Sequence, residues 1–124
     1  MIGRAWRGAL GLVFFLFIGA GPVASAQAAE LVMFEAKGCP YCARWDADIG
    51  PHYAKTEEGR LLALRRVDVD EPRPDDLKAV LGIRFTPTFV VLDRGHEVGR
   101  IVGYIGEYQF WGLLGKLVER LKDQ

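Results

Sequence analysis

Short apolar blocks, separated by polar and glycine-containing segments, predict alternating strands and helices from residue 31 onward. Four of these blocks, at 31–34, 61–70, 89–92 and 98–102, have the length and the residue types of strands. Helical spacing and capping signals predict a first helix that opens at Cys39 and breaks at Gly50-Pro51, a short helix over 75–81 and a last helix over 107–122. The resulting order, β-α-β-α-β-β-α, predicts one α/β domain.

Apolar side chains on three of these elements are expected to build the core. Trp45 and Ile49 lie four positions apart on the first helix, and we expect both to face the sheet. The second predicted strand offers Leu62, Leu64, Val67 and Val69. The last helix carries a stripe made by Phe110, Leu113, Leu114, Leu117 and Leu121, which Trp111 and Val118 widen.

Several polar residues of these elements are expected to lie in solvent. Arg65 and Arg66 are adjacent in the second strand, so their side chains point to opposite faces, and we expect a solvated sheet edge. A hairpin turn is predicted at 93–96, with Gly95 at its centre. His52 on the first helix and His96 beside the turn are expected to be exposed and without a chemical role.

The first 26 residues have the pattern of a signal peptide. Two arginines precede an apolar stretch over 9–18, and a cleavage site of the A-x-A type ends at Ala26. Because the apolar stretch is shorter than the ~20 residues that span a bilayer, cleavage is favoured, and an uncleaved short anchor is the alternative. We therefore expect residues 27–124 to form one exported domain.

The two cysteines, Cys39 and Cys42, flank Pro40 and Tyr41 at the predicted start of the first helix. Proline suits the first helical position, which places Cys39 where free N–H groups and the helix dipole stabilise an anion. We expect this position to lower the pKa of Cys39 and to increase its thiolate fraction. Cys42 lies nearly one turn inward, so the pair can close a small disulfide ring and open it again.

The C-x-x-C spacing also occurs in haem and metal sites. Haem attachment is excluded because Ala43, rather than histidine, follows Cys42. A closed zinc site needs four ligands, and only His52 and His96 could complete one. A carrier of a soft ion such as Cu(I) and an inert structural disulfide stay open as alternatives, although so short a loop gains little stability from closure. Redox chemistry is favoured, and no cofactor and no metal is expected for it.

Two motifs occur together in this chain at a separation typical of one family. A C-P-Y-C motif spans 39–42, Thr86-Pro87-Thr88 follows about 45 residues later, and Gly103 closes the last strand. With these motifs the sequence resembles the thioredoxin superfamily across essentially all of residues 27–124. The resemblance implies a thioredoxin-like α/β fold with a central mixed four-stranded sheet flanked by helices.

The resemblance also implies roles for individual residues. Cys39 and Cys42 are the expected catalytic pair, and the Thr86–Pro87 peptide bond is expected to be cis and to lie against their disulfide. The backbone of Thr86 is expected to pair with an extended substrate segment. Tyr41, Thr86 and Pro87 are therefore the expected substrate-binding residues.

Two positions depart from the family pattern. Thioredoxins carry a buried acid six residues before the first cysteine, where this chain has Met33. Glu35, on the same strand face, is the candidate proton acceptor for Cys42, and an exposed Glu35 without a role is the alternative. Gly103-Tyr104 stands where glutaredoxins, which share the C-P-Y-C motif, carry Gly-Gly, which argues against a glutathione pocket.

Within the superfamily, the stretches 44–70, 86–104 and 106–114 resemble the small exported thioredoxins of bacterial sulfur oxidation, the SoxS type. The resemblance implies a periplasmic thiol-disulfide oxidoreductase that reduces a reactive disulfide of a partner protein. It would receive electrons from a membrane donor, without stable membrane insertion of its own. Oxidase or isomerase activity uses the same residues and stays an alternative. The 16 basic and 16 acidic side chains balance, so nucleic acid is not expected as a partner.

Overall fold

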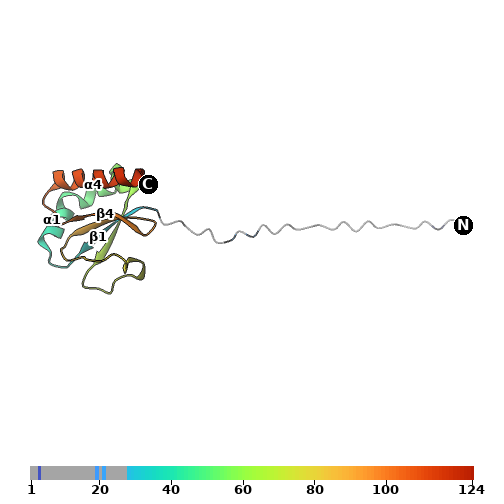
Figure 1. The fold of residues 1–124 in the computed structure, drawn as a ribbon, viewed down its shortest axis with the longest axis horizontal. Coiled ribbons are helices and arrows are strands. Elements are labelled where there is room, and N and C mark those ends of the chain that lie inside the picture. The colour runs from blue at the N-terminus through green and yellow to red at the C-terminus, as the bar shows by residue number, and fades with distance from the viewer. Residues whose placement is uncertain (1–2, 4–18, 20, 22–27) are drawn as a thin grey trace.

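The computed structural model describes residues 3, 19, 21 and 28–124, and Figure 1 shows the domain that they form. The predicted signal peptide over 1–26 and its cleavage site lie outside the described residues, apart from those three isolated positions. In the part of the chain that is described, no helix has the length and apolar character needed to cross a membrane.

A mixed four-stranded sheet forms the centre of the domain, as the resemblance implied. Its strands are β1 (Glu30–Glu35), β2 (Ala63–Asp68), β3 (Thr88–Asp93) and β4 (His96–Val102), in the spatial order β2-β1-β3-β4. β1 pairs with β2 in parallel and with β3 antiparallel, and β3 and β4 form an antiparallel hairpin. In the hairpin turn Arg94 and Gly95 have φ angles of 49° and 80°, the left-handed backbone that such turns require.

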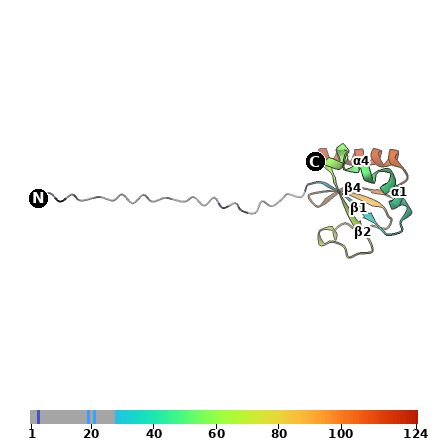
Figure 2. The ribbon, with the colours of Figure 1, turned by 180° about the vertical axis from the view of Figure 1, so that it is seen from behind.

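Helices cover one face of this sheet, and a largely irregular segment covers the other. The helices are α1 (Pro40–Asp48), α2 (Gly50–Tyr53), α3 (Glu57–Leu61) and α4 (Glu107–Lys122). Figures 1 and 2 show α1 and α4 on one side of the sheet and the connection from β2 to β3 on the other. That connection contains the single-turn 3₁₀ helix η1 (Asp75–Leu77).

β1 lies between two strands and is buried on both of its faces. Leu31 and Met33 pack into the core beneath the helices, whereas Val32 and Phe34 pack into a second core on the side of η1. Alternate side chains of a strand project to opposite faces, so one continuous apolar run can supply both cores.

Trp45 lies at the centre of the core beneath the helices. Its ring centroid is 5.3 Å from that of Phe89 on β3 and 5.8 Å from that of Phe110 on α4. Trp45 and Ile49 are both buried, which confirms that this face of α1 packs on the sheet. The aromatic side chains therefore join the helices α1 and α4 to β3 of the sheet.

The bounds of α4 agree with the predicted helix over 107–122. Phe110, Leu114 and Leu117 are buried along it, as predicted, but Leu113 is 37% exposed. Because successive residues of an α-helix are turned by about 100°, Leu113 lies at the flank of the buried stripe rather than in it. The prediction of a core position for Leu113 was therefore wrong.

The helix predicted over 75–81 was also wrong in type and length. Only Asp75–Leu77 is helical, as a single 3₁₀ turn, and Gly82 follows with a φ of 72°. A helix of seven residues has little stability of its own. The two apolar side chains that this segment buries, Leu77 and Val80, are three positions apart, a spacing that a 3₁₀-like backbone can also bring to one face.

A further short helix, α3, occupies part of the predicted second strand. It opens at Thr56, whose side chain accepts a hydrogen bond from the Gly59 amide at 3.0 Å. Leu61 belongs to this helix, and β2 begins only at Ala63. Gly59 is buried against α2, where an added Cβ would lie 1.8 Å from the carbonyl oxygen of Tyr53.

The polar residues of these elements agree only in part with expectation. His52 and His96 are exposed, as predicted. β2 is an edge strand, and its two arginines point to opposite faces, but both are bound by carboxylates rather than simply solvated. Arg65 donates to the two oxygens of Asp76 at 2.6 and 3.0 Å.

Candidate active site

The two cysteines lie where the chain turns from β1 into α1. Gly38, with a φ of 75°, makes the turn, and Cys39 is the N-cap of the helix, with Pro40 in its first turn. The missing N–H of proline costs nothing at this position, and its fixed φ suits the helix. The structure thus places Cys39 at the N-terminus of α1, as the sequence predicted.

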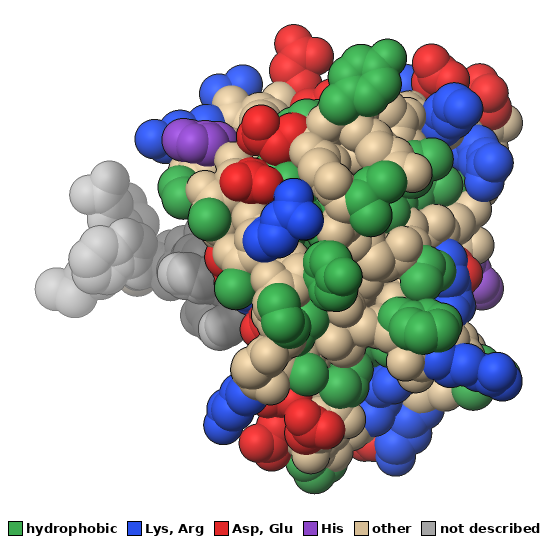
Figure 3. Space-filling view, turned by 90° about the vertical axis from the view of Figure 1, so that its left-hand side faces the viewer, with side chains coloured by type: hydrophobic (Ala, Val, Ile, Leu, Met, Phe, Trp, Pro, Cys, Tyr) green, Lys and Arg blue, Asp and Glu red, His purple; other side chains and the backbone are tan. Residues whose placement is uncertain are grey.

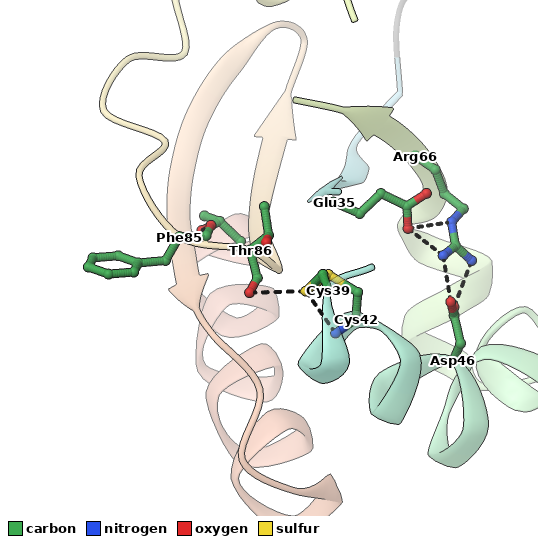
Figure 4. The surroundings of a disulfide bond; sticks show 8 residues. Glu35, Cys39, Cys42, Asp46, Arg66, Phe85 and Thr86 are labelled. Atoms are coloured by element: carbon green, nitrogen blue, oxygen red, sulfur yellow. Dashed lines mark hydrogen bonds and ion pairs between the residues drawn. A yellow bond between two sulfur atoms is a disulfide. The ribbon is translucent and has the colours of Figure 1, made fainter. Parts of the chain in front are cut away.

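Cys39 and Cys42 form a disulfide with an S–S distance of 2.30 Å and a Cα–Cα distance of 5.3 Å (Figure 4). The two sulfurs differ in accessibility, because Cys42 is 4% exposed whereas Cys39 is partly exposed. The backbone amide of Cys42 lies 3.1 Å from Cys39 Sγ and donates to it. This amide can stabilise negative charge on the more accessible sulfur once the disulfide is opened.

The loop before β3 faces the disulfide from the other side. The Thr86–Pro87 peptide bond is cis, as predicted, and the carbonyl oxygen of Thr86 lies 3.4 Å from Cys39 Sγ. The Gly103 amide donates to the Pro87 carbonyl at 2.7 Å, and the Thr88 hydroxyl donates to the Phe85 carbonyl at 2.6 Å. These bonds hold the loop in place beside the cysteines.

Exposed apolar side chains occur on this end of the molecule. Tyr41 is 53% exposed between the cysteines, and Phe85 is 67% exposed next to Thr86. Ile105 is exposed just after the end of β4. Figure 3 shows hydrophobic side chains gathered over the middle of this end, with charged side chains around them. Such a surface suits contact with another polypeptide.

Charged side chains line the opposite side of the disulfide. Glu35, at the end of β1, lines the same cavity as Cys39 and Cys42, but its carboxylate is paired with Arg66 of β2. Arg66 also binds Asp46 of α1, with Nη1 2.8 Å from Oδ1 (Figure 4). The prediction placed Glu35 near the cysteines and missed both of its neighbours, because their approach depends on how β1, β2 and α1 are packed.

Met33 is buried at the position where thioredoxins carry an acid, and it offers no proton acceptor. Tyr104, which follows Gly103, is buried and donates a hydrogen bond to Asp48 of α1 at 2.8 Å. Burial, and then this hydrogen bond, raise the pKa of Tyr104 to about 12. Sequence reasoning used Tyr104 only to argue against a glutathione site and missed its contact with α1.

Among the described residues, no group of three or more His, Cys, Asp and Glu side chains is placed to hold a metal ion. His52 and His96 lie on α2 and β4, and neither is among the residues that line the cavity beside Cys39 and Cys42. A four-ligand site made from the two cysteines and the two histidines is therefore not formed.

A disulfide that opens a helix and faces a cis-proline at the start of a neighbouring strand defines a class, the thiol-disulfide oxidoreductases of thioredoxin-like fold. This chain belongs to that family, because the family model described as the thioredoxin-like domain matches residues 23–117. A comparison with curated protein sequences finds no match.

Solved structures show the same likeness. The chain is similar to the periplasmic thioredoxin SoxS from Paracoccus pantotrophus in its reduced form, with 43% identity and a TM-score of 0.70 over 75% of this chain and 98% of that chain. It is also similar to thioredoxin from Malassezia sympodialis, with 27% identity and a TM-score of 0.54 over 71% of this chain and 73% of that chain. A thioredoxin from Thermus thermophilus gives 27% identity and a TM-score of 0.55 over 73% and 74%.

Proposed function

We propose that this protein is an exported thioredoxin that reduces disulfide bonds of partner proteins in the periplasm. The observation that carries the proposal is the hydrogen bond from the Cys42 amide to Cys39 Sγ at the mouth of α1. It supports a nucleophilic thiolate at the accessible sulfur, with a second sulfur held close enough to resolve the product. The similarity to a periplasmic thioredoxin at 43% identity supports the location.

The reaction transfers two electrons from the reduced Cys39 and Cys42 pair to the partner's disulfide. The Cys39 thiolate attacks one sulfur of the partner's disulfide, the partner's S–S bond breaks, and a mixed disulfide forms. Cys42 then loses its proton and attacks Cys39, which closes the Cys39–Cys42 bond and releases the second thiolate of the partner. The partner gains two electrons and two protons, and this protein is oxidised to its disulfide form.

The substrate segment lies in extended form beside the loop that precedes β3. The backbone of Thr86 next to the cis peptide bond pairs with it, as in the addition of a short strand to a sheet. Tyr41, next in sequence to the helix start, and Phe85, next to Thr86, add exposed apolar surface, which favours a polypeptide over a small polar disulfide.

Reduction requires an electron donor that returns the disulfide to two thiols. In the periplasm this donor is a membrane protein, since soluble reductants are scarce there. Oxidase or isomerase activity would use the same two cysteines. The redox potential of the Cys39–Cys42 pair distinguishes a reductase from an oxidase. Equilibration with a redox buffer should give a midpoint below about −200 mV for a reductase, whereas a midpoint near about −120 mV would indicate an oxidase.

Trapping of the mixed disulfide tests the exchange itself. A Cys42→Ser variant forms the first bond and lacks the sulfur that resolves it, so covalent adducts with partner proteins should accumulate on non-reducing gels. Cys39→Ser is the control and should accumulate none. If wild-type protein reduces a protein disulfide but Cys42→Ser traps nothing, the scheme is wrong. Metal content of protein purified in the reduced state tests the alternative of a Cu(I) carrier.

A further inference from the structure

Arg66 lies on the face of β2 that is directed toward α1 and the cysteines. It pairs in register with Met33 of β1, and paired residues of adjacent strands project to the same face. Arg65 pairs with Val32, projects to the other face and binds Asp76. The side chains of these two neighbouring arginines therefore lie on opposite faces of the sheet, and of the two only Arg66 lines the cavity beside Cys39 and Cys42.

Two carboxylates from two different elements hold the guanidinium of Arg66. Its Nη1 and Nη2 lie 2.8 and 2.9 Å from the two oxygens of Asp46 on α1. Its Nε lies 3.1 Å from Glu35 Oε2 at the end of β1, to which Nη2 also donates. The hydrogen bonds to Asp46 and then to Glu35 raise the pKa of Arg66, so it stays charged. The planar guanidinium presents several N–H donors in fixed directions, so it can bind both carboxylates at once. The ammonium group of a lysine is a compact point charge and does not offer this geometry.

These three side chains line an open cavity of about 290 Å³ whose wall also includes Cys39 and Cys42. A polar cavity of this volume has ample room for water. Hydrogen-bonded water in it can carry a proton between the sulfurs and the carboxylates. Figure 4 shows the guanidinium of Arg66 bridging the carboxylates of Glu35 and Asp46 to one side of the cysteines.

The charge on the cavity wall is unequal. The charged side chains on it are Glu35 of β1, Lys37 of the following turn, Asp46 of α1, and Arg66 and Asp68 of β2. Three carboxylates therefore face two cations, and the wall keeps one negative charge. Without Arg66, three carboxylates would face one cation, and the wall would carry two net negative charges. These charges would lie next to a sulfur that has to become an anion.

We propose that Arg66 is a positioning residue of the exchange reaction, and that it holds Glu35 and Asp46 as a joint acceptor for the proton of Cys42. This inference rests on the proposed function and adds Arg66 and Asp46 to it. In the resolving step the Cys42 S–H bond breaks and its proton passes to the carboxylate pair through the cavity. The sulfur then bonds to Cys39, and the partner's sulfur leaves as a thiolate.

The resolving step can be observed with dithiobis(nitrobenzoate) as the probe. Cys39 of the reduced protein takes up one thionitrobenzoate group and releases the other, which gives a first coloured phase. Cys42 then displaces the bound group, which gives a second phase. Stopped-flow absorbance with equimolar reagent records both phases, and Cys42→Ser identifies the first because it lacks the second. The rate of the second phase is measured against pH.

Arg66→Met should raise the pH of half-maximal rate of the second phase by about one unit and slow it up to about tenfold at lower pH, because the thiolate of Cys42 forms beside unneutralised carboxylates. Arg65→Met is the matched control on the same strand and should leave this pH unchanged. Arg66→Lys keeps the charge without the fork and should lie between them. Circular dichroism and thermal melting confirm that each variant is folded.

The double variant Glu35→Gln/Asp46→Asn removes both acceptors and should slow the second phase by more than about tenfold at neutral pH, while the first phase changes less than about threefold. The proposal is overturned if Arg66→Met shifts the pH of half-maximal rate no more than Arg65→Met, or if the double variant keeps the wild-type second phase. Failure of the proposed function is read from other measurements, a midpoint near about −120 mV or the absence of adducts with Cys42→Ser, and neither of these depends on Arg66.

Discussion

The phenol oxygen of Tyr104 lies 2.8 Å from Oδ2 of Asp48, and this hydrogen bond joins the loop after β4 to α1. The same loop contains Gly103, whose amide donates to the Pro87 carbonyl. The helix that carries Cys39 and the loop that carries the cis-proline are therefore both tied to residues 103–104. The relative position of the two halves of the site depends on this short segment.

Tyr104→Phe removes the hydrogen bond to Asp48 and should lower the free energy of unfolding by about 1 kcal/mol. For a domain of this size, the melting temperature should fall by about 4–8 °C. Tyr108→Phe is the control, because Tyr108 is 96% exposed and should melt as the wild type does. Equal melting temperatures for both variants would show that the bond to Asp48 contributes nothing.

The raised pKa of Tyr104 predicts a loss of stability in alkaline solution. Burial, and then the hydrogen bond to Asp48, raise the pKa of Tyr104 to about 12, whereas an unfolded tyrosine has a pKa near 10, so the unfolded state loses its proton first. The stability that this group contributes is complete below pH 10 and is lost as the pH rises from 10 to 12. Urea unfolding at several pH values should show a smaller alkaline loss for Tyr104→Phe than for the wild type.

Gly59→Ala should destabilise the protein by about 3 kcal/mol or more. The new Cβ would lie 1.8 Å from the Tyr53 carbonyl oxygen, so α2 and α3 would have to separate. Gly112→Ala is the matched control in α4, where an added Cβ meets no atom within 4 Å. There the change should stabilise the helix by about 0.5–1 kcal/mol. Chemical denaturation of both variants measures the two opposite effects.

Leu77→Ala should cost about 2–5 kcal/mol of unfolding free energy, because Leu77 is completely buried in the core on the η1 side of the sheet. Leu81→Ala, four residues later, removes a side chain that is 74% exposed and should change stability little. A change in stability for Leu77→Ala as small as that expected for Leu81→Ala would mean that η1 does not anchor its connection to the sheet.

Phe85→Ala should weaken the use of protein disulfides without loss of stability. Phe85 is 67% exposed beside Thr86, so its removal leaves the core intact but takes apolar surface from the face that we propose to contact the substrate. We expect KM for a protein disulfide to rise about threefold to tenfold, with little change in kcat. The second-order rate with dithiobis(nitrobenzoate), which is too small to cover this surface, is the control reaction and should stay constant.

Local signals in the sequence were sufficient for much of the fold. The run at 31–34 gave β1, the alternation around Gly95 gave the hairpin, and the apolar stripe gave α4 with its bounds. α3 was missed although Thr56 carries a capping signal, because the apolar residues at 61–62 were assigned to the strand that follows. η1 was predicted as an α-helix, since spacing of three residues does not distinguish the two kinds of helix over so short a segment.

The candidate site likewise has a part that the sequence predicts and a part that it does not. The positions of Cys39, Cys42 and the cis Thr86–Pro87 bond could be predicted, because each belongs to a motif whose residues are close in sequence or match a family pattern. The binding of Asp46 by Arg66 could not, since these residues are 20 positions apart and meet only when β2 and α1 take their places. The packing of α1 against the sheet brings these two residues together, and the pattern of polar and apolar residues does not predict it.

The hairpin turn at Arg94 and Gly95 has a practical consequence. β3 runs antiparallel to β1, so the turn lies at the opposite end of the sheet from Cys39, about 20 Å away along a six-residue strand. A fluorescent label or an affinity sequence inserted between these two residues would not contact a partner protein bound at the cysteines. Captured covalent complexes could then be purified from cell extracts, and their formation followed in real time, without a reporter group beside the thiols.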